Sequence, residues 1–167
     1  MASLDQHAIC GVFNAAFGAD HGVRLVGGGR EPAYTPPAPG RCGELLCRED
    51  FAASALHEAA HWCCADRGMR AQDDYGCVYV PPPRGVAGQT RFFAMEQRVQ
   101  AYECWFAAAA GIEFNASADD PDWALVDVRC FEARVRAHAA AFAWRPSLAA
   151  ARARCFVARL ASARAAL

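Results

Sequence analysis

The sequence contains no lysine, so all 17 of its basic residues are arginine, and 18 acidic residues bring the net charge to −1. Arginine can fill most surface roles of lysine, and we interpret the absence of lysine as coding bias. A balanced charge provides no electrostatic attraction for a strongly anionic partner. We therefore expect no binding to nucleic acid.

Long apolar runs and export signals are missing as well. The most apolar stretch, "CWFAAAAGI" at residues 104–112, is far shorter than the ~20 residues that a membrane span requires. The opening "MASLDQHAICG" lacks a basic segment followed by an apolar one, and the nine cysteines include no C-x-x-C pair. These absences predict a cytoplasmic protein with reduced thiols and no membrane partner. The oligomeric state is left open by the sequence, and a monomer is the favoured state.

The spacing of apolar residues predicts a mainly helical α+β fold. A chain of 167 residues is about one domain's worth, and no repeat or linker divides it, so we expect a single domain over residues 1–167. Asp5 and Asp50 are placed to cap two helices. Helices are expected at residues 5–17, 51–67, 89–110, 123–144 and 147–165, and short strands at residues 24–26, 43–48 and 75–80.

The stretch "ASALHEAAHWCC" at residues 53–64 carries the most informative pattern. On a helix, His57 and His61 project from one face and can both bind a single cation at ~2.0–2.1 Å. Glu58 lies about 100° around the helix, where it cannot easily be a ligand but can contact a metal-bound water. The alternative is a helix with two core histidines, whose imidazoles would need other hydrogen-bond partners.

A third ligand is expected on the helix that begins near Gln89. Glu96, Gln100 and Glu103 follow one another along the border of its apolar face, where a cation would offset the burial of the carboxylates. Ordinary boundary glutamates paired with Arg98 or water are the alternative. The apolar face itself is predicted at Phe92, Met95, Val99, Tyr102 and Phe106. Solvated or capping roles are favoured for the three isolated histidines, which are His7, His21 and His138.

Two histidines and one carboxylate support two different chemistries. With Zn(II), Glu58 would act as the general base of a small metallopeptidase, and the predicted strand at residues 75–80 could hold an extended peptide. With Fe(II), the open positions would bind oxygen and substrate for a hydroxylation. A non-catalytic module with a structural metal is a third alternative, but such sites are usually closed by a fourth ligand.

Three segments together resemble the elongation factor P hydroxylase family: "ASALHEAAHWCC", "DDYGCVYVPPPR" and "EQRVQAYECWFAAAAGIEFNAS". The resemblance covers roughly residues 33–120, and the C-terminal helices match only loosely. It implies a zincin-like body and a metal held by His57, His61 and Glu96, with Fe(II) expected and Zn(II) as the alternative. It also implies hydroxylation of the modified, β-lysylated lysine of elongation factor P. Glu58 is the expected catalytic residue.

Overall fold

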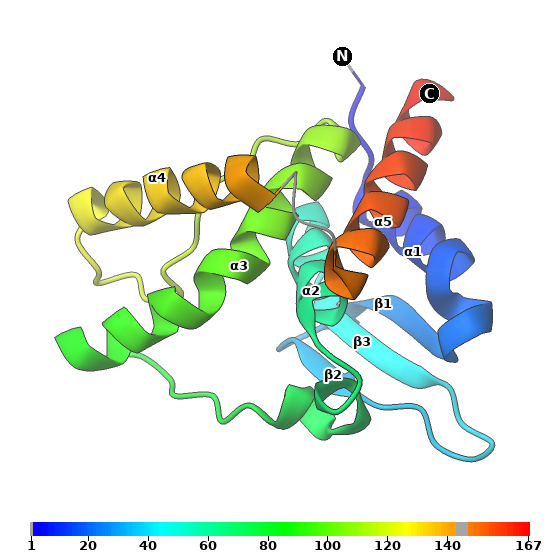
Figure 1. Ribbon diagram of the computed structural model, residues 1–167, viewed down its shortest axis with the longest axis horizontal. Coiled ribbons are helices and arrows are strands. Elements are labelled where there is room, and N and C mark those ends of the chain that lie inside the picture. Colours follow the sequence, from blue (N-terminus) through cyan, green and yellow to red (C-terminus); the bar gives the residue numbers. More distant parts are fainter. Residues whose placement is uncertain (1, 143–146) are drawn as a thin grey trace.

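The computed structural model describes residues 2–142 and 147–167 (Figure 1). The mainly helical α+β fold that the sequence predicts is confirmed, and Trp144, the expected end of one helix, lies outside the described residues. The elements are α1 (Gln6–His21), β1 (Val23–Gly29), β2 (Ala33–Thr35), β3 (Gly43–Arg48), α2 (Ala52–Cys64), η1 (Met69–Ala71), η2 (Asp73–Gly76), α3 (Val86–Ala110), α4 (Leu125–Phe142) and α5 (Leu148–Ala165).

The three strands form one small mixed sheet in the order β1-β3-β2. The central strand β3 runs parallel to β1, with Leu25 opposite Leu45, and antiparallel to β2. Alternate residues of the strands are buried, as expected for a sheet with one face on the core; Val23 and Cys47 are two of them. The strands predicted at residues 24–26 and 43–48 are therefore confirmed.

Helix α2 lies at the centre of the molecule. Figure 1 shows α3 and α4 on one side of it, and α1, α5 and the sheet on the other. Trp62 of α2 is only 1% exposed, and its ring meets Phe13 of α1 edge-on at 5.4 Å, while Phe13 meets Phe156 of α5 at 5.7 Å. Edge-to-face aromatic contacts of this kind stabilise a core beyond their buried area. The residues of α2 are thus held from several sides.

The helix ends agree with the sequence at α1 but not at α2. The Asp5 side chain accepts a hydrogen bond from the backbone N–H of Ala8 and caps α1. At α2 the capping position is Phe51, which makes no side-chain cap, so the prediction for Asp50 is wrong. Ser54 instead accepts a hydrogen bond from the Arg48 backbone N–H at 2.9 Å, which joins the end of β3 to the first turn of α2.

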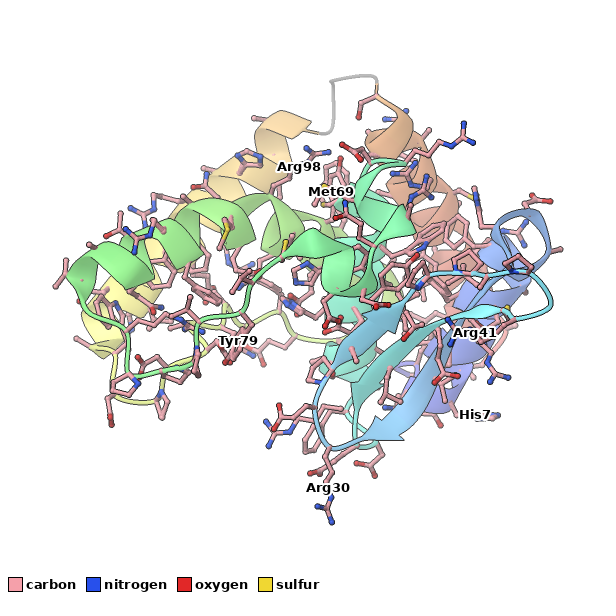
Figure 2. The ribbon with its side chains drawn as sticks, turned by 90° about the horizontal axis from the view of Figure 1, so that it is seen from below. His7, Arg30, Arg41, Met69, Tyr79 and Arg98 are labelled. Carbon is pink, nitrogen blue, oxygen red and sulfur yellow. The ribbon has the colours of Figure 1, made fainter. Side chains whose placement is uncertain are left out.

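The strand predicted at residues 75–80 is not formed. Residues 73–76 make a turn of 3-10 helix, and the following residues are extended without strand pairing. Val78 is 87% exposed and Tyr79 63% exposed, and Figure 2 shows Tyr79 on this segment before α3. β-branched and aromatic residues favour strands only where a neighbouring strand and a core face are present. Neither is present here.

The apolar face predicted for α3 is wrong at one position. Met95 is 63% exposed, whereas Phe93 is buried and its ring stacks on Phe131 of α4 at 4.2 Å. The end of the helix is as expected, because Gly111 follows it with φ 77° and donates its N–H back to the last turn. Among residues 2–142 and 147–167, we find no helix with the length and apolar character that crossing a membrane requires.

Candidate metal centre

The two histidines of α2 lie one helical turn apart and converge on one point. Their ring centroids are 4.7 Å apart with an interplanar angle of 79°, and the Nε2 atoms of His57 and His61 are 3.1 Å apart. Both side chains are partly buried against α3. The i, i+4 spacing has therefore produced the paired nitrogen atoms that the sequence predicts.

Glu96 of α3 completes the group. One carboxylate oxygen lies 3.4 Å from His61 Nε2, and the other lies 3.6 Å from His57 Nε2. Four-coordinate ligands at ~2.0–2.2 Å from a metal are about 3.4 Å from one another. The three observed separations are close to that value. We call His57, His61 and Glu96 the His–His–Glu group; it is a candidate metal site in which all ligand atoms lie within 4.8 Å of one another.

Glu103 orients the first histidine of the group. One of its carboxylate oxygens accepts a hydrogen bond from His57 Nδ1 at 2.7 Å. With Nδ1 occupied in this way, Nε2 is the atom that faces Glu96. A carboxylate behind a metal-binding histidine is a common arrangement, because it fixes the ring and increases its basicity. The sequence placed Glu103 beside Glu96 but did not show this role, which depends on how α3 packs against α2.

The surroundings drive the protonation of the two histidines in opposite directions. Burial lowers the pKa of His57, but the charge and hydrogen bond of Glu103 outweigh it and raise that pKa to about 10. Burial lowers the pKa of His61 to about 4. At neutral pH, metal-free His57 is thus protonated, and its Nε2–H donates a hydrogen bond to the neutral His61 ring. A bound metal would take the place of the proton on His57 Nε2.

Gln100 holds the Glu96 carboxylate in place. Its amide donates to Glu96 at 3.4 Å and to the Ser117 carbonyl at 2.9 Å, and it accepts from the Ser117 N–H at 3.0 Å. Glu96, Gln100 and Glu103 are all buried rather than at the border of the helix. The polar stripe of α3 therefore faces α2, and its hydrogen bonds explain how such polar residues are buried.

Glu58 directly follows His57 on α2 and is 7% exposed. Burial raises the pKa of Glu58 to about 7; the charge of His57 opposes this, while the nearby carboxylates of Glu96 and Glu103 act with burial. A carboxyl group with a pKa near 7 can take up or release a proton at physiological pH. Glu58 is therefore a candidate acid–base residue.

The other histidines do not reach the group. His7 is exposed on the outer face of α1 (Figure 2), His21 packs against the ring of Trp62 at 5.0 Å, and His138 contacts Gln97 at 3.2 Å. The alternative of Glu96 and Glu103 as ordinary boundary residues paired with Arg98 does not fit either, because both carboxylates face the histidines. Cys63 is fully buried in the core.

The fold and the site together define an α+β protein with a candidate two-histidine, one-carboxylate metal group. A family model described as elongation factor P hydroxylase matches residues 12–165, which includes α4 and α5 and is wider than the predicted range of 33–120. The chain belongs to the elongation factor P hydroxylase family.

A curated relative supports this assignment. The chain is 38% identical over 115 residues to the elongation factor P lysine hydroxylase of Haemophilus influenzae. The match covers 67% of this chain and 64% of the relative, which is less than two thirds of the relative's length. The resemblance that the sequence shows is therefore confirmed.

Proposed function

We propose that this chain is a metal-dependent hydroxylase that acts on the β-lysylated lysine of elongation factor P, with residues 1–167 as one catalytic domain. The observation that carries the proposal is the convergence of His57, His61 and Glu96 in a member of this family. Three protein ligands leave positions open on a metal, which catalysis requires and a structural site does not. The substrate is proposed from the relative of Haemophilus influenzae, which is an elongation factor P lysine hydroxylase.

The donor set fits a divalent transition metal. Two imidazole nitrogens and one carboxylate with open positions are the ligands of non-haem Fe(II) oxygenases, so we propose Fe(II) and keep Zn(II) as the alternative. Bound iron would supply the activation of dioxygen. In the overall reaction a C–H bond becomes C–OH with one oxygen atom of dioxygen; the other atom leaves as water, with two protons and two electrons from an external reductant.

The residues around the metal have separate tasks in this proposal. His57, His61 and Glu96 hold the ion, while Glu103 fixes the ring of His57 through the hydrogen bond to Nδ1. Glu58, whose pKa is about 7, can hold or release a proton beside the substrate.

Coexpression tests the substrate. Cells that produce this chain, elongation factor P and the enzymes that attach the β-lysyl group should yield a lysine-bearing peptide heavier by one oxygen atom than the peptide from cells without this chain. The readout is peptide mass spectrometry. An unoxidised β-lysylated lysine in the presence of soluble, metal-loaded protein would contradict the proposed substrate.

A zinc peptidase is the second candidate, favoured by the position of Glu58 directly after His57 on α2. The segment at residues 75–80 gives no edge strand to bind an extended peptide, which weakens this candidate. We expect the metal-loaded protein to leave casein intact, and Glu58→Gln to reduce hydroxylation only in part, because no water-activating base is obligatory in an oxygenase. Robust cleavage of casein that chelators abolish would show that the peptidase is the correct function.

The third candidate, a binding module with a structural metal, is not favoured. Among the described residues the candidate group comprises three ligands, whereas structural zinc sites usually have four. The raised pKa of Glu58 also favours an enzyme, because perturbed pKa values are concentrated at functional sites.

A further inference from the structure

Tyr75 has a buried hydroxyl group that none of the tasks above uses. The residue is 8% exposed, and its hydroxyl oxygen has no hydrogen-bond partner among the described residues. Buried polar groups are nearly always hydrogen-bonded, because leaving one without a partner costs free energy. A hydroxyl of this kind in a native core calls for a ligand.

The ring of Tyr75 lies beside His61, one member of the His–His–Glu group. It is nearly parallel to the His61 ring, with an interplanar angle of 15° and centroids 6.0 Å apart. The Tyr75 ring also stacks on the ring of Tyr34, with an interplanar angle of 5° and centroids 4.3 Å apart. Tyr34 is itself fixed, because its hydroxyl donates to the Arg70 carbonyl at 2.7 Å. Tyr75 is thus part of a rigid stack that begins at a ligand of the candidate metal site.

The backbone holds Tyr75 in this place at a cost. Asp74, Tyr75 and Gly76 have φ values of 44°, 60° and 71°, so two residues with side chains are in the left-handed region. L-residues rarely adopt this conformation, and where they do so the strain is often found at functional sites. Here the Asp74 side chain accepts a hydrogen bond from the Tyr34 backbone N–H at 2.8 Å, which ties the turn to β2.

Glu58 is the charged residue with the strongest influence on the Tyr75 hydroxyl. Burial raises the pKa of Tyr75 well above its ordinary value, and the charge of Glu58 acts in the same direction. The hydroxyl therefore stays protonated and can donate a hydrogen bond throughout the physiological pH range.

We infer that Tyr75 belongs to the reaction site, where its hydroxyl donates a hydrogen bond to a small ligand bound between the ring, Glu58 and the His–His–Glu group. This inference rests on the proposed function in one respect, namely that the group holds a metal with an open position. The ligand class is a small molecule or anion with an oxygen or nitrogen acceptor, which includes water and a substrate oxygen. A packing role alone would require the ring but not the hydroxyl.

Azide binding to the cobalt-loaded protein tests the inference. Cobalt(II) has visible absorption bands that report ligand exchange, and azide is a small anion that accepts hydrogen bonds. Tyr75→Phe should keep the ring stack and the cobalt content but bind azide about tenfold more weakly, the loss expected for one hydrogen bond. Tyr79→Phe is the matched control, because it removes a tyrosine hydroxyl that donates to Asp119 on an exposed segment, and its azide affinity should equal that of the wild type.

Thermal unfolding of the metal-free variants adds a second readout. Tyr75→Phe should unfold at the same temperature as the wild type or above it, because the variant no longer buries a hydroxyl without a partner. Unchanged azide affinity in Tyr75→Phe would overturn the inference, whether or not the unfolding temperature falls.

Failure of the proposed function gives a different pattern. If elongation factor P is not oxidised but the tenfold effect on azide persists, the substrate is wrong and the role of Tyr75 stands. A wild-type protein that binds no cobalt would overturn both.

Discussion

Alanine at His57, His61 or Glu96 should remove nearly all of the metal that copurifies with this protein. Each residue supplies one of three ligands, and the two that remain would hold an ion weakly. Glu103→Ala should behave differently, because Glu103 bonds to His57 rather than to the ion. We expect this variant to bind one ion with an affinity about 10–100-fold lower.

Elemental analysis of protein purified without chelators or nickel resin provides the measurement. The exposed Glu113 on the loop after α3 offers a matched control, and Glu113→Ala should retain the full metal content. A site that is emptied by Glu103→Ala but not by Glu96→Ala would show that the third ligand has been assigned wrongly. Unfolding of all the ligand variants would indicate a structural metal instead.

Metal affinity should also rise about tenfold for each pH unit between pH 6 and pH 8. The pKa of His57 is about 10 in the metal-free protein, so over this range the ion must displace one proton from the ring. His61, with a pKa of about 4, is already neutral and contributes no slope. Competition with a chelator of known pH dependence measures the effect.

Glu103→Gln sharpens this test. The variant removes the charge that raises the pKa of His57, so the ring should lose its proton at a lower pH and the affinity should level off within the range. A wild-type affinity that does not depend on pH would contradict the protonated state of His57. An identical slope in Glu103→Gln would show that Glu103 is not its cause.

The sequence predicts well what is local. His57 and His61 could be paired from four-residue spacing, because the geometry of a helix alone brings them together. The helices and the strand at residues 43–48 follow in the same way from periodicity, and Gly111 marks the end of α3. The sequence limits the third ligand to the carboxylates on one helix face, but the choice of Glu96 over Glu103 depends on the family resemblance.

Features that depend on tertiary packing could not be predicted. The segment at residues 75–80 has the composition of a strand, but strand formation needs a partner that the fold does not bring there. Met95 is exposed and Phe93 is buried, because α4 covers the side of α3 on which Phe93 lies. Tyr75 reaches the site through a strained turn and a stack on Tyr34, and no spacing in the sequence indicates either.

One measurement tests most directly whether the His–His–Glu group carries out the oxidation. It compares the mass of the modified lysine peptide of elongation factor P between cells with wild-type protein and cells with His57→Ala protein. Oxygen activation requires the metal, so the wild type should add one oxygen atom and His57→Ala should add none, at equal levels of folded protein. Equal oxidation by both proteins would contradict the proposed role of the metal centre.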